Sequence, residues 1–297
     1  MTAETIEELK SLNGYEDNQI IGLPEEMESS VIEFNGKGNI LFFDKGVKLY
    51  NSRITFNGGR SIVFICSSGE YKTRLKVDTF YDNVFYIGRN CNTTRAIMAV
   101  LSERRHIVIG DNCLFSLGTW FRNADPHLIY STETKKRLNP TKSIYVGDHV
   151  WMGQNVLVSK GTHIGSGSII AAKAFTAGKR IPSNCTAGGV PARIIGKGIF
   201  WHPDSVHSYK YAKTQESQIC DTDEFIFEQD GKQVDLNTIE QGINAIKDVN
   251  ERFDFVRKSL YENTDKNRFF IPEPVALKKP WYRILLHNLK MLFIKEI

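Results

Sequence analysis

The sequence predicts a mainly β protein whose chain winds into a parallel β-helix, and two repeats carry this prediction. The stricter repeat consists of five consecutive six-residue units that open with an apolar residue, at Val146, Met152, Val158, Ile164 and Ile170. The second position of each unit is Gly, Ser or Ala, which suits a tight corner. Because six is a multiple of the two-residue strand period, each opening side chain returns to the same side of an extended chain. Short strands joined by tight corners and stacked coil on coil form a β-helix.

A looser repeat extends the same fold toward the N-terminus. Similar apolar runs open at intervals of 22, 22 and 23 residues, at Ile40, Ile62, Val84 and Ile107. The segment YIGRNC at 86–91 also recurs as VIGDNC at 108–113. We therefore expect one coil per recurrence and a single solenoid over residues 39–200. An antiparallel sandwich over residues 39–105 is the alternative that this irregular part of the pattern leaves open.

The segments on either side of the solenoid differ from it. Residues 1–38 form a flanking segment, and the first 30 residues carry one Lys against eight Asp and Glu. Residues 201–297 form a mainly helical extension. Its clearest pattern is a series of apolar residues three or four apart, at Ile239, Ile243, Ile246, Val249, Phe253, Val256 and Leu260. We expect one amphipathic helix there, with Thr238 and Gln241 as a capping box.

The end of the chain has the composition of a basic amphipathic helix. Residues 278–297 carry five Lys and Arg against one Glu, interleaved with Trp, Ile, Leu and Phe. Such a segment can lie on an anionic membrane surface, and we expect peripheral contact with the inner membrane as one possibility. A helix packed on the protein itself or on a neighbouring subunit is the alternative.

Composition narrows the class of protein. Of the 297 residues, 41% are hydrophobic and 24% charged, which supplies enough apolar material for a full core. The apolar runs fall far short of the roughly 20 residues of a membrane-spanning helix. The first residues lack the pattern of a secretory signal, so we expect a cytoplasmic protein. The five scattered cysteines fit buried thiols better than disulfides or a zinc site, and a net charge of +4 is too small to indicate nucleic-acid binding.

One interruption of the repeat marks the candidate catalytic region. Residues 120–143 are polar, contain Pro and break the six-residue pattern, so they must leave the solenoid as a loop. Loops on a rigid scaffold often carry catalytic side chains. This loop holds a single histidine, His127, whose imidazole can accept a proton near neutral pH. Taken alone, such a histidine is more often a surface residue than a general base.

Three blocks of sequence resemble a known family. SIYVGDHVWMGQNV at 143–156, GSGSIIAAKAF at 165–175 and IPSNCTAGGVPARIIGKG at 181–198 are similar to the hexapeptide-repeat acyltransferases. The similarity is greatest to acetyltransferases that modify sugars and bacterial surface polysaccharides, and it covers roughly residues 105–200. The resemblance implies a left-handed β-helix, assembly as a homotrimer with active sites between subunits, and acetyl transfer from acetyl-CoA. The implied acceptor is a hydroxyl of a capsular or other surface polysaccharide.

The resemblance also implies roles for individual residues. His127 becomes the general base, and Asp125, Glu133 or a backbone carbonyl is left open as the group that orients its ring. Trp151 occupies the position of the family's Trp, where its ring borders the reacting groups. Contacts to acetyl-CoA map to Gly153, Gln154, Ala171, Ala172, Lys179, Arg180 and Arg193.

Two positions depart from the family pattern. Gln154 stands where the family often has a hydroxyl-bearing or small residue, which leaves the donor for the oxyanion undefined. The turn TAGKRIP at 176–182 is one residue longer than the family's turn, so Lys179 and Arg180 match only approximately. Arg193 matches better.

Other functions remain open from the sequence alone. The acceptor could be small, such as a nucleotide-linked amino sugar, an antibiotic or an amino acid. A non-catalytic solenoid that docks partners through its C-terminal helices is the alternative from another class. His149 and His163 suggest a metal site between subunits, but both fall at corner positions that usually face solvent and no third histidine follows at matching spacing. We therefore expect no metal.

Overall fold

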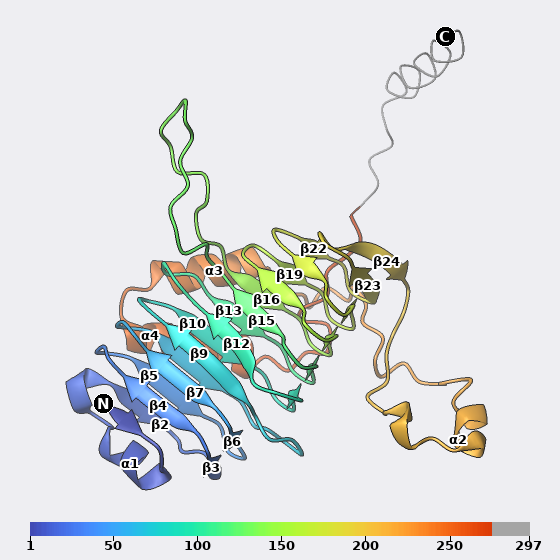
Figure 1. Cartoon of the computed structure of the whole chain (residues 1–297), viewed down its shortest axis with the longest axis horizontal. Helices are drawn as coiled ribbons and strands as arrows, with labels where there is room; N and C mark the ends of the chain where they lie inside the picture. Colours follow the sequence, from blue (N-terminus) through green and yellow to red (C-terminus); the bar gives the residue numbers. More distant parts are fainter. Residues whose placement is uncertain (275–297) are drawn as a thin grey trace.

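The chain winds into a parallel β-helix of stacked coils, as the repeats predict (Figure 1). The structure is a computed structural model that describes residues 1–274. The coils contribute strands to three sides around a common core, and the third side is interrupted at the coil of β8 and β9, which has only an isolated bridge at Thr73. The predicted fold class, a mainly β, left-handed parallel β-helix with a C-terminal helical extension, is confirmed.

The strands are short and follow one another around the three sides. The first sheet contains β1 (Thr2–Ala3), β4 (Val31–Phe34), β7 (Arg53–Phe56), β9 (Leu75–Thr79), β12 (Ile97–Val100), β15 (Trp120–Arg122), β18 (Leu157–Ser159) and β21 (Phe175–Thr176). The second sheet contains β2 (Gln19–Ile21), β5 (Ile40–Phe43), β8 (Ile62–Ile65), β10 (Val84–Ile87), β13 (Ile107–Ile109), β16 (Ile144–Val146), β19 (His163–Ile164) and β22 (Arg180–Ile181). The third sheet contains β11 (Asn92–Thr93), β14 (Leu114–Phe115), β17 (Trp151–Met152), β20 (Ile169–Ile170), β23 (Cys185–Gly188) and β24 (Arg193–Lys197), and the pair β3 (Glu26–Glu28) and β6 (Lys48–Tyr50) precedes it in the early coils.

The six-residue units fold as their pattern predicts. Their opening residues all point into the core, and none is more than 1% exposed. The small second position is a steric requirement at the corners. A Cβ on Gly147 would lie 2.6 Å from the backbone nitrogen of Ser166, and one on Gly153 would lie 2.6 Å from that of Ala172. The coils therefore stack too closely there for a larger residue.

The early coils belong to the same solenoid. Ile62 lies between Ile40 and Val84 in parallel register, which excludes the antiparallel sandwich. Parallel pairing begins at β2, about 20 residues before the expected boundary at residue 39. The outward positions of this first coil are largely acidic, which hid its apolar pattern in the sequence.

The N-terminus closes the first coil. β1 pairs antiparallel with β4, and helix α1 (Ile6–Ser11) buries Leu9 completely. Thr5 and Glu8 form a reciprocal capping box at the start of α1. A short 3-10 turn, η1 (Tyr15–Asp17), leads into β2.

The expected C-terminal helix is divided in two. Helix α3 (Leu236–Ala245) ends before Ile246, which is extended, and helix α4 (Val249–Val256) follows, continuing into a π turn at η3 (Arg257–Tyr261). Asp248 accepts hydrogen bonds from Asn250 and Glu251 N–H and so starts a second helix. Asp235, rather than the predicted Thr238, caps α3. A strong cap within the apolar pattern therefore breaks the single helix that was predicted.

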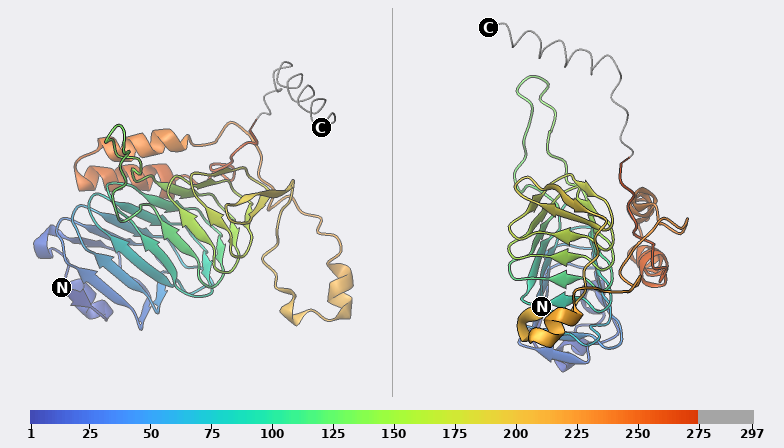
Figure 2. Two further views of the ribbon diagram at one scale, coloured as in Figure 1. Left: turned by 45° about the horizontal axis from the view of Figure 1, so that its top comes forward. Right: turned by 90° about the vertical axis from the view of Figure 1, so that its right-hand side faces the viewer.

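Helices α3 and α4 lie against the outer face of the second sheet (Figure 2). Their apolar side chains, among them Ile239 and Phe253, cluster with Ile40, Phe64 and Tyr86 of that sheet. Between the β-helix and α3, the chain projects away through the short elements η2 (Val206–Ser208) and α2 (Tyr211–Glu216). Within residues 1–274, the extension thus covers the second sheet, whereas Met98 on the first sheet and Trp151 on the third remain more than one-third exposed.

Two further expectations concern the cysteines and the tail. Cys66, Cys91, Cys113 and Cys185 are buried free thiols, as predicted, but Cys220 is exposed. The basic segment 278–297 lies outside the described residues. Within residues 1–274, none of the helices combines the length and the apolar composition needed to span a bilayer.

Candidate active site

The predicted catalytic loop leaves the β-helix between β15 and β16, at the corner between the first and second sheets (Figure 1). Its base is fixed by polar contacts. The Asn139 side chain, 6% exposed, donates to the His127 carbonyl at 2.7 Å and to the Asp125 carboxylate at 3.1 Å. Farther along the loop, Arg137 makes a two-point ion pair with Glu103 on the solenoid, at 2.7 and 2.9 Å. The backbone around His127 is therefore held in place.

The His127 side chain itself is exposed, and its ring has no hydrogen-bond partner among residues 1–274. Asp125 is engaged elsewhere, since Lys160 lies 2.5 Å from its carboxylate and lowers the pKa of that group. Glu133 lies in the turn at the loop tip, where its N–H bonds to Ser131. The structure thus places none of these carboxylates on the His127 ring. Sequence reasoning missed three residues that hold this loop: Asn139 within it, and Glu103 and Lys160 on the solenoid, which the fold brings next to it.

Trp151 lies on a different side of the molecule. Its side chain stands on the outer face of the third sheet and is 38% exposed, in register with Leu114 and Ile169 on the neighbouring strands. Its indole lies 6.0 Å, centroid to centroid, from that of Trp201 in the extension. Within one chain, the fold does not bring Trp151 to His127.

The small residues expected to contact acetyl-CoA stack at the corner between the third and first sheets. Ala172 lies directly above Gly153, and Lys173 N–H bonds to the Gln154 carbonyl at 2.7 Å. The Gly153 N–H already donates to the Ile170 carbonyl at 2.8 Å, so it is not available to an oxyanion. Exposed Gln154 is the candidate donor closest in the chain to Trp151.

The three basic residues expected near the nucleotide come together. Lys179, Arg180 and Arg193 line one cavity of about 190 Å³ near the C-terminal end of the solenoid, together with Ala187 and Ala192. Ala192 N–H bonds to the Phe175 carbonyl, which seats the segment that carries Arg193 on the last coil. The additional residue in the turn at 176–182 therefore does not separate these cations.

His149 and His163 behave differently from the prediction that both face solvent. His149 is 5% exposed, and its ring stacks on Trp201 at 3.9 Å and on Phe225 at 4.6 Å. His163 is half-buried beside the Tyr145 ring. Burial lowers the pKa of both imidazoles. In the part of the chain that the structure describes, no three His, Cys, Asp or Glu residues are grouped as a metal site would need.

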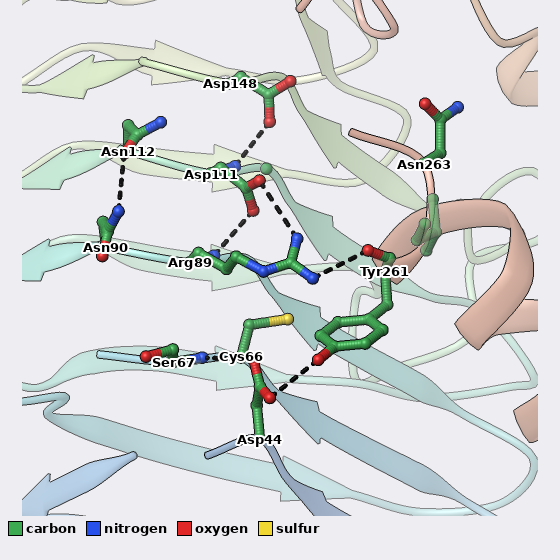
Figure 3. Close-up of polar contacts among 12 residues, drawn as sticks. Asp44, Cys66, Ser67, Arg89, Asn90, Asp111, Asn112, Asp148, Tyr261 and Asn263 are labelled. Atoms are coloured by element: carbon green, nitrogen blue, oxygen red, sulfur yellow. Dashed lines mark hydrogen bonds and ion pairs between the residues drawn. The ribbon is translucent and has the colours of Figure 1, made fainter. Parts of the chain in front are cut away.

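A buried ion network attaches the extension to the corner between the second and third sheets (Figure 3). Asp111 accepts from the Arg89 backbone N–H at 2.7 Å, and Asp148 accepts from the Asp111 N–H at 2.6 Å. Arg268, 1% exposed, bonds Asp148 at 2.8 and 3.0 Å and lies 3.0 Å from Asp111. Tyr261 accepts from Arg89 through its carbonyl.

A cavity of about 630 Å³ lies beside this network and is lined by both the solenoid and the extension. Sequence reasoning missed its residues. The repeated motif of Gly, any residue, then Asn or His, at 88–90, 110–112 and 147–149, is the signal that could have identified its solenoid side.

Comparisons with known proteins place the chain beside sugar-modifying enzymes. No family model matches the chain. A protein of Escherichia coli O1:K1 / APEC named polysialic acid O-acetyltransferase is 33% identical over 115 residues, which are 39% of this chain and 37% of that protein. A Neisseria meningitidis protein of the same name is 28% identical over 176 residues, 59% of this chain and 81% of that protein. The chain thus spans little more than a third of the first relative and four-fifths of the second.

A solved structure agrees with the fold. The crystal structure of a polySia-specific acetyltransferase superposes with a TM-score of 0.54 at 23% identity, covering 67% of this chain and 97% of that one. At this identity the likeness supports the fold alone. Together with the sequence relatives, it confirms the predicted resemblance to the hexapeptide-repeat acetyltransferases.

Proposed function

We propose that this chain, which resembles the hexapeptide-repeat acetyltransferases, is an O-acetyltransferase that moves an acetyl group from acetyl-CoA to a sugar hydroxyl of a capsular or other surface polysaccharide. The observation that carries the proposal is His127, held through its backbone on a loop of a β-helix whose relatives are polysaccharide O-acetyltransferases. We place the reaction in the cytoplasm, where CoA thioesters are formed.

The proposed chemistry is direct transfer. The His127 imidazole removes the proton of the acceptor hydroxyl while the oxygen of that group attacks the thioester carbonyl. A hydrogen-bond donor, for which Gln154 is the candidate, stabilises the oxyanion of the tetrahedral intermediate. Collapse of this intermediate breaks the C–S bond, and the imidazolium returns its proton to the departing thiolate. The products are the acetyl ester and CoA, with no acyl-enzyme.

The placement of the groups supports a homotrimer, because His127 and Trp151 lie on different sides of one chain. Two apolar ladders on the free sheets offer contact surfaces. Met98, Trp120, Leu157 and Phe175 lie in register on the first sheet, and Leu114, Trp151 and Ile169 on the third. The projecting loop carries four large apolar side chains that are each at least half exposed, Leu128, Ile129, Tyr130 and Leu138. A neighbouring copy that covers these residues would bring His127 of one subunit to Trp151 of the next.

The residues proposed to contact acetyl-CoA fall into two groups, one for each end of the molecule. Gly153, Gln154, Ala171 and Ala172 would border the pantetheine arm at the corner beside Trp151. Lys179, Arg180 and Arg193 would hold the phosphates, because their cavity gathers three cations. No metal takes part in this proposal.

The function is tested by CoA release from acetyl-CoA. Wild-type protein and His127→Ala would be offered de-O-acetylated surface polysaccharides, nucleotide sugars and small antibiotics. We expect polymer-dependent release that falls by about 10²- to 10⁴-fold in the variant, the usual contribution of a general base. Release only with small acceptors would assign the runner-up substrate class. Absence of both acetyl-CoA binding and release would contradict the proposal and favour the non-catalytic docking solenoid.

A further inference from the structure

The 630 Å³ cavity is built jointly by the β-helix and the C-terminal extension. Its solenoid side follows the corner between the second and third sheets, from the turn at Glu70 and Tyr71 up to Asp148. Its other side comes from residues 201–227 and 264–268, which belong to the C-terminal extension. The extension therefore completes a recess on the outside of the β-helix.

Two asparagines form the polar floor of this recess. Asn90 and Asn112 occupy equivalent corner positions with φ of 55° and 56°, a left-handed conformation that Asn tolerates better than most residues. Their backbone N–H groups bond to the Ser67 and Arg89 carbonyls of the preceding coils. Their side chains are exposed and share one hydrogen bond of 3.3 Å. The side-chain oxygen of Asn90, which lies against Gly69, and the side-chain amino group of Asn112 have no hydrogen-bond partner among residues 1–274, so they offer an acceptor and a donor to the cavity.

The extension leaves these two amides uncovered while it covers the next corner. His149 follows Asn112 in the same column and is sealed between Trp201 and Phe225. The aromatic cluster of His149, Trp201 and Phe225 thus covers the corner at His149 but not the corners at Asn112 and Asn90. Tyr71, Leu114 and the edges of Trp201 and Phe225 supply apolar walls around the polar floor. Apolar rings beside convergent amides suit a sugar, which presents C–H faces as well as hydroxyls.

The charge of the recess disfavours an anion. Five carboxylates and two cationic side chains line it. Asp111 and Asp148 form ion pairs with buried Arg268, so the positive charge of Arg268 is neutralised within the network. In the described part of the chain, the Glu70 and Glu224 carboxylates have no ion-pair partner, against one cation without a carboxylate partner, Lys266, whose ammonium donates to the Asp223 carbonyl. An anionic sugar would therefore meet repulsion, whereas a neutral one would not.

A cavity of opposite charge lies across the third sheet. Arg74, Lys76 and Arg95 line a recess of about 450 Å³ at the corner between the third and first sheets. None of the three forms an ion pair with another described residue. An anionic chain would favour this second recess. The two cavities therefore predict acceptors of different charge: the recess at Asn90 and Asn112 favours a neutral sugar, and the recess at Arg74, Lys76 and Arg95 favours an anionic chain.

We propose that the recess floored by Asn90 and Asn112 binds a neutral saccharide segment of the acceptor and leads it to Trp151. The inference rests on the proposed function, and it specifies the acceptor more closely than the names of the relatives do. Leu114 connects the two places, since it lines the recess and lies in register with Trp151. A chain bound there would continue over the exposed face of that indole.

The test uses Asn90→Gly/Asn112→Gly in the full chain, because Gly keeps the left-handed backbone and removes both amides. Asn51→Gly, with φ of 46° in the basic recess, is the matched control. Binding is measured on an array of neutral oligosaccharides and sialic acid oligomers. We expect neutral saccharides to bind the wild type and the control, and at least tenfold weaker binding by the double variant. Acetyl-CoA binding should be unchanged, and the acceptor KM should rise more than kcat falls.

Two results would overturn the inference. One is that no neutral saccharide binds, or that the double variant binds as the wild type does. The other is binding of sialic acid oligomers that Lys76→Glu/Arg95→Glu abolishes, which would place the acceptor in the basic recess. Acetyl-CoA binding and CoA release are scored separately. A protein that releases CoA but fails the array test refutes only this inference, and one that binds saccharides without using acetyl-CoA refutes only the proposed function.

Discussion

At the scale of single residues, the position of His127 depends on contacts that the His127 side chain does not make. Asn139 holds its backbone, and Glu103 ties the loop to the solenoid through Arg137 and through a short hydrogen bond from Thr141. Hydrogen bonding by Arg137, followed by that of Thr141, lowers the pKa of Glu103 to about 2. At pH values above 4.5, the ordinary pKa of Glu, the ionised carboxylate anchors the loop fully. The stabilisation by this anchor is lost as the pH falls from 4.5 through about 2, where Glu103 becomes protonated.

Glu103→Gln should loosen the predicted catalytic loop without unfolding the protein. An exposed ion pair contributes little to global stability, so we expect an almost unchanged Tm. Hydrogen exchange at pH 7 should be several-fold faster for the amide of Leu138, which bonds across the loop to the Ile129 carbonyl. Glu133→Gln, at the loop tip, is the control and should exchange like the wild type. Equal exchange in Glu103→Gln and the wild type would show that the ion pair does not anchor the loop.

At the scale of elements, the corners decide which residues the coils accept. Gly147→Ala would press a Cβ against the backbone of Ser166 in the next coil, 2.6 Å away. We expect a loss of about 1–3 kcal/mol in the free energy of unfolding, as for other overpacked sites. Gly196→Ala, whose nearest contact would be an ordinary 3.4 Å, should be nearly neutral. Guanidinium unfolding of the two variants measures the difference, and equal stabilities would contradict the close stacking of the corners.

The docking of the extension depends on the buried network around Arg268. Burial raises the pKa of Asp148, and Arg268 opposes this rise. Arg268→Met removes the compensating charge from Asp148 and from the facing Asp111, so we expect a loss of about 3–5 kcal/mol at pH 7. A carboxyl with a raised pKa binds its proton more tightly in the folded state, so the loss should be smaller at pH 5 than at pH 7. Adding Asp148→Asn should restore part of the free energy of unfolding. A loss that changes neither with pH nor with Asp148→Asn would contradict this role of Arg268.

At the scale of the whole molecule, the sequence predicts the repeating coils well, but it predicts little of how the N-terminal segment and the C-terminal extension pack against them. The five six-residue units predict the β-helix because their period fixes which side chains point inward. The first coil was missed because its outward acidic residues mask the pattern, and the helix break was missed because Asp248 caps a new start inside it. Lys179, Arg180 and Arg193 line one cavity, and their contact with acetyl-CoA stays a prediction. The repeated motif that contains Asn90 and Asn112 could have indicated the solenoid side of the recess. Its other side could not be predicted, because the extension contacts the solenoid across more than a hundred residues of chain.

In the proposed function, His127 and Trp151 of one chain are too far apart to act together, so the proposed mechanism requires an assembly of subunits. If each site takes the base from one subunit and the indole from the next, neither residue can be replaced without loss of every site in a uniform trimer. Mixed trimers differ, because a site between a His127→Ala subunit and a Trp151→Ala subunit can receive both wild-type residues. Random mixing of the two chains would restore about one quarter of the sites.

The most direct test of this account is therefore CoA release by His127→Ala and Trp151→Ala, first separately and then after co-expression. We predict that each variant alone forms trimers with little activity, and that the co-expressed mixture recovers about a quarter of the wild-type rate. Inactive mixtures of correctly assembled trimers would contradict a site shared between subunits. Full activity of His127→Ala alone would contradict its role as the base.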